Sequence, residues 1–213
     1  HTSVSFFSAT HTRFSHAIGS MLIMNKLFNH VQEKGLAPEV FEEAKKYYPD
    51  AAKHFGNEKT MVHCHLLLAA LYQDVGELPF QKVTGQYFTT VATDVAGLVN
   101  EFGDPAKRWN VKTVFTILCL RRDLLESASR TGFAGFDLEL LVYLITGDGA
   151  PDGVSALPAL LQMVDGVVDA DRLDYVYRDA SVTIGSLSRP ITVLESVVRY
   201  APGCGIVDDP RPV

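Results

Sequence analysis

The chain has no long hydrophobic run, no excess of basic residues and few cysteines, and each shortage argues against a class of protein. No apolar stretch approaches the roughly 18 residues that a membrane-spanning helix needs, and the start lacks the basic and apolar regions of a secretion signal. The formal net charge of -6 argues against a nucleic-acid partner, because proteins that coat nucleic acid carry a basic surface. The cysteines, Cys64, Cys119 and Cys204, show no paired metal-binding spacing, which favours a reducing, cytoplasmic compartment.

Several common catalytic motifs are also missing. The sequence contains no glycine-rich phosphate loop, no Gly-x-Ser-x-Gly turn and no Cys-x-x-Cys pair. With 213 residues, of which 47% are hydrophobic and 21% charged, the chain can bury one sizeable core. We therefore expect a single domain over residues 1–213. Because the sequence starts without Met and stops just after a strand-like segment, we expect a fragment of a longer polypeptide with other domains.

Hydrophobic periodicity predicts a mostly α-helical fold. Apolar residues between positions 16 and 31 roughly follow the 3.6-residue period of a helix, and Gly35 closes this stretch. Residues 60–72 are apolar on nearly all sides, which predicts a helix at the centre of the core. Further helices are expected at residues 39–48, 80–102, 107–130, 136–145, 157–168 and 172–178. A β-like bias at residues 191–194 and 197–200 predicts a small β element near the C-terminus.

Four polar residues in three separated segments are candidate ligands for a divalent cation. His16 lies near the start of the first predicted helix and Asp171 near the start of a later one, while Gln73 and Asp74 end the central apolar helix. Imidazoles and carboxylates that converge from different helices suit a cation that activates water. Each residue alone also has an ordinary interpretation: His16 as a helix-start residue, Asp74 as a turn residue and Asp171 as an N-cap. Spacing alone does not predict that the segments meet.

The segments around these residues resemble three motifs of the HD superfamily of phosphohydrolases. Residues 9–19 are similar to the opening motif of its deoxynucleoside-triphosphate triphosphohydrolase branch, which includes the SAM-and-HD-domain enzymes. Residues 68–80 are similar to the middle motif and residues 169–179 to the late motif, in the same order along the chain. The resemblance implies an HD-type helical bundle and a metal-dependent phosphohydrolase that acts on nucleotides.

The resemblance also implies roles for individual residues. The metal ligands it implies are His16, Asp74 and Asp171. Arg13 would hold a substrate phosphate, for which a forked guanidinium is well suited. The residues that would contact triphosphate and sugar are Arg172, Tyr175 and Asp179. The ordinary alternatives are a core position for Tyr175 and a surface ion pair between Arg178 and Asp179. Such relatives often oligomerise, so a homo-oligomer is expected.

The middle motif departs from the family pattern at the residue before its aspartate. The family has a histidine there, whereas this chain has Gln73, whose amide oxygen is a poorer donor toward zinc, iron or nickel. Magnesium or manganese is therefore the expected cation, and the alternative is that none is bound. His63 and His65 lie at least eight residues before Gln73, about 12 Å along a helix, so neither can replace the missing ligand.

The branch also carries imidazoles three and eight positions after the motif aspartate, where this chain has Glu77 and Lys82. A carboxylate at the first of these positions resembles HD-type 5'-deoxynucleotidases, in which it orients or deprotonates water. Glu77 and Asp74 are therefore the catalytic candidates, and the alternative for Glu77 is a solvated turn residue. Two functions remain open: a working phosphohydrolase, or a catalytically degenerate domain that senses a nucleotide or supports assembly. A nucleic-acid-binding scaffold is a third, disfavoured by the acidic charge.

Overall fold

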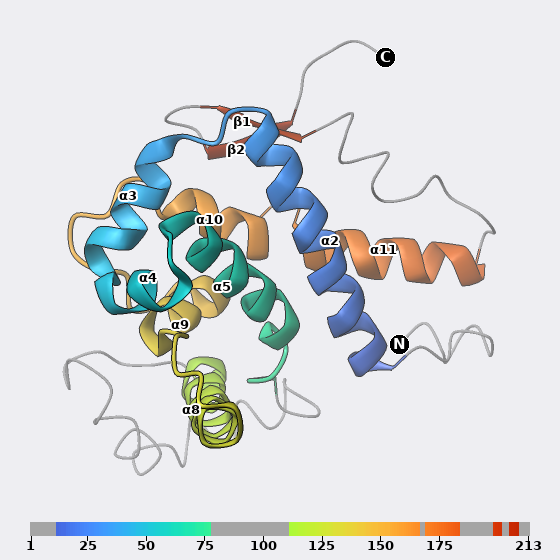
Figure 1. Cartoon of the computed structure of the whole chain (residues 1–213). Helices are drawn as coiled ribbons and strands as arrows, with labels where there is room; N and C mark the ends of the chain where they lie inside the picture. Colours follow the sequence, from blue (N-terminus) through green and yellow to red (C-terminus); the bar gives the residue numbers. More distant parts are fainter. Residues whose placement is uncertain (1–11, 78–110, 167–168, 184–197, 202–204, 209–213) are drawn as a thin grey trace.

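The computed structural model describes residues 12–77, 111–166, 169–183, 198–201 and 205–208. Within these ranges the chain is mostly α-helical, as the sequence predicts (Figure 1). The eight helices described there are α2 (Arg13–Glu33), α3 (Pro38–Tyr47), α4 (Pro49–Phe55), α5 (Glu58–Tyr72), α8 (Val111–Thr131), α9 (Leu138–Thr146), α10 (Pro158–Val164) and α11 (Ala170–Thr183). The segments expected to be helical at 80–102 and β-like at 191–194 lie outside the described residues.

Helix α5 lies at the centre of the bundle. Its Met61, Leu66 and Ala69 are fully buried, and the helix packs against α2, α3, α4, α9 and α10 (Figure 1). A helix that is apolar all round has to be covered on every side, because any exposed face would leave hydrophobic area in water. The central helix predicted at residues 60–72 is therefore confirmed.

Proline marks the start of three helices. Pro38, Pro49 and Pro158 are the first residues of α3, α4 and α10, where a backbone N–H is not needed. Pro49 thus ends α3 and also begins α4, which is not among the predicted helices. After Pro49, its only apolar residues are Ala51, Ala52 and Phe55, too few to show a hydrophobic period in the sequence.

A small antiparallel sheet lies near the C-terminal end of the described chain. It consists of β1 (Val198–Ala201) and β2 (Gly205–Asp208), with Arg199 opposite Val207. Strand β1 overlaps the segment 197–200, for which the sequence has a β-like bias. The sheet contacts α2 and α10 (Figure 1). Among the described helices, none combines the length and the hydrophobicity that crossing a membrane requires.

Glu43 of α3 ties this helix to the start of α10. Its carboxylate accepts hydrogen bonds from the N–H groups of Ser155 at 2.9 Å, Ala156 at 2.7 Å and Leu157 at 2.7 Å. Burial by itself raises the pKa of the Glu43 carboxyl, but these hydrogen bonds together hold it below its ordinary value of 4.5. The stabilisation is therefore present above pH 4.5 and is lost as the pH falls through the lowered pKa.

Glu43→Gln should lower the free energy of unfolding by about 1–2 kcal/mol at pH 7. This is the lower part of the range for charged hydrogen bonds, because solvent screens this partly exposed group. Glu42→Gln, on an exposed part of the same helix, is the matched control and should change stability by less than about 0.5 kcal/mol. Urea unfolding between pH 3 and pH 7 measures both, and the difference should shrink in acid. Equal losses at pH 7 would contradict the assigned role of Glu43.

Candidate metal centre

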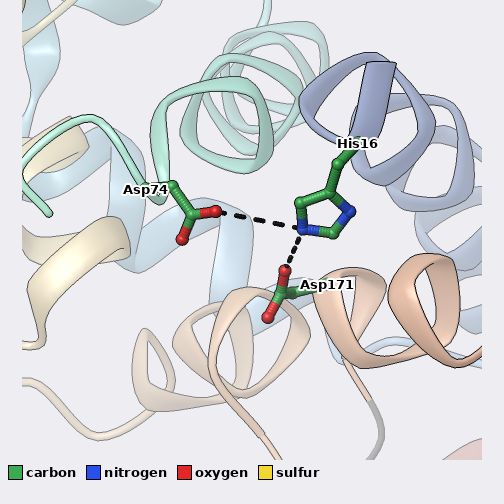
Figure 2. A group of neighbouring side chains, drawn as sticks. All are labelled: His16, Asp74 and Asp171. Carbon is green, nitrogen blue, oxygen red and sulfur yellow. Dashed lines mark hydrogen bonds and ion pairs between the residues drawn. The ribbon is translucent and has the colours of Figure 1, made fainter. Parts of the chain in front are cut away.

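A capping box at the start of α2 sets the position of His16. The side chain of Thr12 accepts a hydrogen bond from the Ser15 N–H at 3.1 Å, and the Ser15 hydroxyl accepts one from the Thr12 N–H at 3.1 Å. This reciprocal pair starts the helix at Arg13 and places His16 in its first turn. From there the imidazole points toward Asp74 and Asp171 (Figure 2).

Gln73 and Asp74 follow the last residue of α5, where the chain turns. The turn is closed by a hydrogen bond from the Glu77 N–H to the Asp74 carbonyl at 3.0 Å. Gly76 lets the turn lie directly on α8, because a Cβ atom there would overlap the backbone carbonyl oxygen of Lys112. Close packing on α8 therefore fixes the turn that carries both candidate ligands.

Asp169 caps the start of α11. Its carboxylate accepts hydrogen bonds from the N–H groups of Arg172 at 2.7 Å and Gly166 at 3.1 Å. The N-cap role that was the ordinary alternative for Asp171 thus belongs to Asp169. The side chain of Asp171, in the first turn, faces His16 instead (Figure 2).

His16, Asp74 and Asp171 come together from these three segments (Figure 2). One ligand atom from each residue lies within 4.8 Å of the other two. His16 Nε2 is 2.6 Å from Asp171 Oδ1 and 3.9 Å from Asp74 Oδ2. The imidazole is 13% exposed, whereas the Asp74 and Asp171 side chains are 34% and 33% exposed, so solvent reaches the group from its carboxylate side. This group could hold a metal ion.

Gln73 lies beside this group and fits a cation site. Its Nε2 donates to Asp171 Oδ1 at 2.6 Å, while its Oε1 is buried and has no hydrogen-bond partner in the described parts of the chain. A half-turn of the amide exchanges the two atoms and directs the oxygen toward Asp171. One amide oxygen and two carboxylates suit a hard cation, and the single imidazole of His16 is also compatible with manganese.

Two carboxylates hold the His16 imidazole in place. Nε2 is 2.6 Å from Asp171 Oδ1, and Nδ1 is 2.7 Å from Asp174 Oδ2. Hydrogen bonds with Asp171 and Asp174 raise the pKa of His16 from 6.5 to about 10, against the opposing effect of burial. In the cation-free protein this imidazole is therefore protonated at neutral pH. A cation held at Nε2 would have to displace that proton.

Arg13 and Glu77 lie at the same edge of the site. The Arg13 guanidinium contacts the carbonyl oxygen of Glu77 at 3.5 Å, which places Arg13 beside the turn that carries Asp74. The Glu77 carboxylate is 3.7 Å from Lys112 Nζ. It does not belong to the cation group formed by His16, Asp74 and Asp171 among the described residues.

Two of the candidates on α11, Arg172 and Tyr175, have exposed side chains, whereas Asp179 is partly buried. Tyr175 is 43% exposed, so the alternative of a core position is wrong. The Arg172 side chain is 49% exposed, with Nε 3.5 Å from Asp169 Oδ2. Asp179 lies two helical turns after Asp171, on the same face of α11 as Tyr175. Arg178 contacts Asp174 and the Ser15 carbonyl oxygen, so its guanidinium lies between α11 and α2.

Neither His63 nor His65 reaches the site. The His63 ring stacks on Phe28 with the ring centroids 4.3 Å apart. His65 is fully buried; one ring nitrogen contacts the Met61 carbonyl oxygen at 2.8 Å and the other accepts from the Asp137 N–H at 2.9 Å. Burial lowers the pKa of both imidazoles. His65 is buried in the core and His63 is partly buried against Phe28, in agreement with the prediction that they cannot replace the missing ligand.

Sequence reasoning missed the residues that lie behind His16, which are Gly19, Asp174 and Arg178. A signal for two of them was present in the late motif. Asp174 lies three residues after Asp171, and Arg178 lies four residues after Asp174. This spacing puts their side chains on one face of a helix.

Gly19→Ala should destabilise the protein by about 1–3 kcal/mol. Alanine ordinarily stabilises a helix relative to glycine by about 1 kcal/mol, but a Cβ atom here would overlap Asp174 Oδ1 and Arg178 Nη2. Asn29→Ala, at an exposed position of the same helix, is the matched control and should be neutral or slightly stabilising. Thermal unfolding measures both. A stabilised Gly19→Ala variant would show that α2 and α11 pack less closely than described.

No protein-family model, curated protein or solved structure matches the chain. Its function therefore has to follow from the geometry of the site and the residues that form it.

Proposed function

We propose that this protein is a metal-dependent phosphohydrolase of the HD superfamily that acts on nucleotides. The observation that carries the proposal is that His16, Asp74 and Asp171 come together in space to form one solvent-accessible group (Figure 2). These residues are separated by 58 and 97 positions (74 − 16 and 171 − 74), so proximity along the chain does not bring them together. They lie in the three segments that resemble the HD motifs, in family order, and their meeting in space supports that resemblance.

The ligand set would be His16, Asp74 and Asp171, with the oxygen of Gln73 as a fourth donor. A divalent cation bound there would supply Lewis-acid activation of water for attack on phosphorus. Magnesium or manganese is the proposed cation, because Gln73 offers oxygen where the family has imidazole nitrogen.

The proposed chemistry also assigns tasks to the residues around this group. Arg13, beside the turn after α5, would neutralise phosphate oxygens of the substrate. Asp74 is a third exposed and can accept a proton on the open side of the site. The ion pair between Glu77 and Lys112 would have to break before the Glu77 carboxylate could accept a proton. Arg172, Tyr175 and Asp179 remain candidates for contacts to the nucleotide.

A second function is favoured by the bond between Gln73 and Asp171. The amide donates to the same Asp171 oxygen that lies 2.6 Å from His16 Nε2, so α2, α11 and the end of α5 are joined without a cation. A domain built in this way keeps the fold and a phosphate-binding edge but not the catalysis. It would serve as a nucleotide-sensing or assembly module in a larger protein.

Elemental analysis followed by a nucleotide panel separates the two functions. Protein purified without chelator should retain a stoichiometric divalent cation and should release product from a nucleotide when manganese is added. Asp74→Ala should lose both properties, whereas Asp152→Ala, at an exposed position on the loop between α9 and α10, should keep them. Bound nucleotide without turnover would instead favour the sensing module. Absence of both cation and nucleotide binding would contradict the phosphohydrolase and the nucleotide-sensing module, and would favour the assembly module.

A further inference from the structure

We propose that Asp174 is a positioning residue for the cation site: it holds the Nδ1–H of His16, so that Nε2 faces Asp74 and Asp171. This inference rests on the proposed function, because it requires that a cation binds at Nε2. It assigns a role to an aspartate that is not itself a ligand.

Asp174 differs from the other two aspartates in burial. Its side chain is 5% exposed, whereas those of Asp74 and Asp171 are 34% and 33% exposed. Its Oδ2 lies 2.7 Å from His16 Nδ1, on the opposite side of the ring from Nε2. A carboxylate behind a ligand imidazole fixes the tautomer and orientation of the ring and makes the other nitrogen a better donor. The two partly exposed aspartates can thus receive the cation while the buried one holds the imidazole.

Arg178 holds Asp174 from behind. Its Nε contacts Asp174 Oδ2, and its Nη2 donates to the Ser15 carbonyl oxygen at 2.6 Å. One guanidinium therefore joins the carboxylate on α11 to the backbone of α2 next to His16. It also compensates the charge of a carboxylate that would be costly to bury unpaired.

Gly19 provides the space for this arrangement. It lies three residues after His16, on the side of α2 that packs against α11. A Cβ atom at this position would overlap both Asp174 Oδ1 and Arg178 Nη2. A residue without a side chain is thus needed for the Asp174 and Arg178 pair to reach the imidazole.

The test compares Asp174→Asn with Asp123→Asn in the full chain. Asp123 lies on α8, outside the cation group. It is a matched control because its carboxylate also accepts a side-chain hydrogen bond, from the Tyr72 hydroxyl at 3.0 Å. Calorimetric titration with manganese should show a Kd that rises about 10–100-fold in Asp174→Asn and is unchanged in Asp123→Asn. Asp174→Ala, which removes the acceptor entirely, should bind manganese more weakly than Asp174→Asn. If Asp174→Ala does not fold, the isosteric Asp174→Asn carries the test.

Proton NMR of the cation-free protein provides a second measurement, the chemical shift of the His16 Nδ1 proton. This shift would not change if Asp174 only stabilised the fold. A proton on His16 Nδ1 that is bonded to a carboxylate should resonate at low field, and it should move upfield in Asp174→Asn because an amide oxygen is a weaker acceptor. Loss in His16→Gln assigns the low-field signals to this ring, and Asp171→Asn identifies the Nε2 proton, which faces Asp171 at 2.6 Å, so that the remaining signal belongs to Nδ1. An unchanged manganese Kd, or an unmoved Nδ1 proton, would overturn the inference while the proposed function stands. Equal losses in Asp123→Asn would also overturn it. Failure of the wild-type protein to bind manganese would overturn the proposed function and this inference together.

Discussion

Replacing Gln73 by histidine should raise the affinity of the site for manganese and zinc by at least about tenfold. Imidazole nitrogen is a stronger donor than an amide oxygen toward transition metals, and the gain should be larger for zinc than for magnesium. The change also removes the amide that now donates to Asp171 Oδ1 at 2.6 Å, which frees this carboxylate for a cation. Both effects act in the same direction.

The matched control for this change is Gln32→His, which adds an imidazole to the same protein but 16 residues after His16 on α2. That separation is about 24 Å along a helix, so the control should not alter the cation content. Elemental analysis and calorimetric titration of both variants provide the measurement. A Gln73→His protein that binds manganese and zinc with the affinities of the wild type would contradict the placement of Gln73 among the ligands. If Gln73→His binds a cation and turns over nucleotide while the wild type does neither, the missing histidine at position 73 alone explains why the protein would be a sensing module.

The helical framework could be predicted because its signals are local. Residues 60–72 are apolar all round, and Pro38 and Gly35 mark helix ends by their backbone properties alone. The candidate ligands were also predictable, because His16, Asp74 and Asp171 each lie in a segment that resembles a known motif. Their meeting was not derivable from spacing, because packing of α2, α5 and α11 depends on side chains throughout the core.

The residues that hold His16 were not predicted, for a physical reason. A buried carboxylate such as Asp174 and a partly exposed one such as Asp171 are identical in the sequence, and only the packing of α11 against α2 distinguishes them. The same applies to Gly19, whose lack of a side chain matters because another helix approaches it. Glu43 is a further case, since its three N–H donors lie 112 to 114 residues away along the chain.

Asp171→Asn should abolish stoichiometric cation binding and reduce the turnover of the proposed phosphohydrolase by about 10³-fold or more. Asp171 is the common partner in the site, since its Oδ1 lies 2.6 Å from His16 Nε2 and 2.6 Å from Gln73 Nε2. Its hydrogen bond is also the largest cause of the raised pKa of His16, which should therefore fall below about 10 in the variant. An NMR titration of the His16 ring measures this directly, in the absence of any cation.

Lowering the pKa of His16 should change the stability of the protein in a pH-dependent way, which a packing defect would not do. A group with a raised pKa stabilises the folded state fully below its ordinary pKa of 6.5, and this contribution is lost as the pH rises through about 10. Asp171→Asn should therefore cost stability at pH 6 and little at pH 11, whereas a packing defect would cost similar amounts at both. If the titration leaves the pKa of His16 near 10, Asp171 does not control this imidazole. If nucleotide binding survives while cation binding is lost, the protein holds the nucleotide independently of the cation, as the proposed sensing module requires.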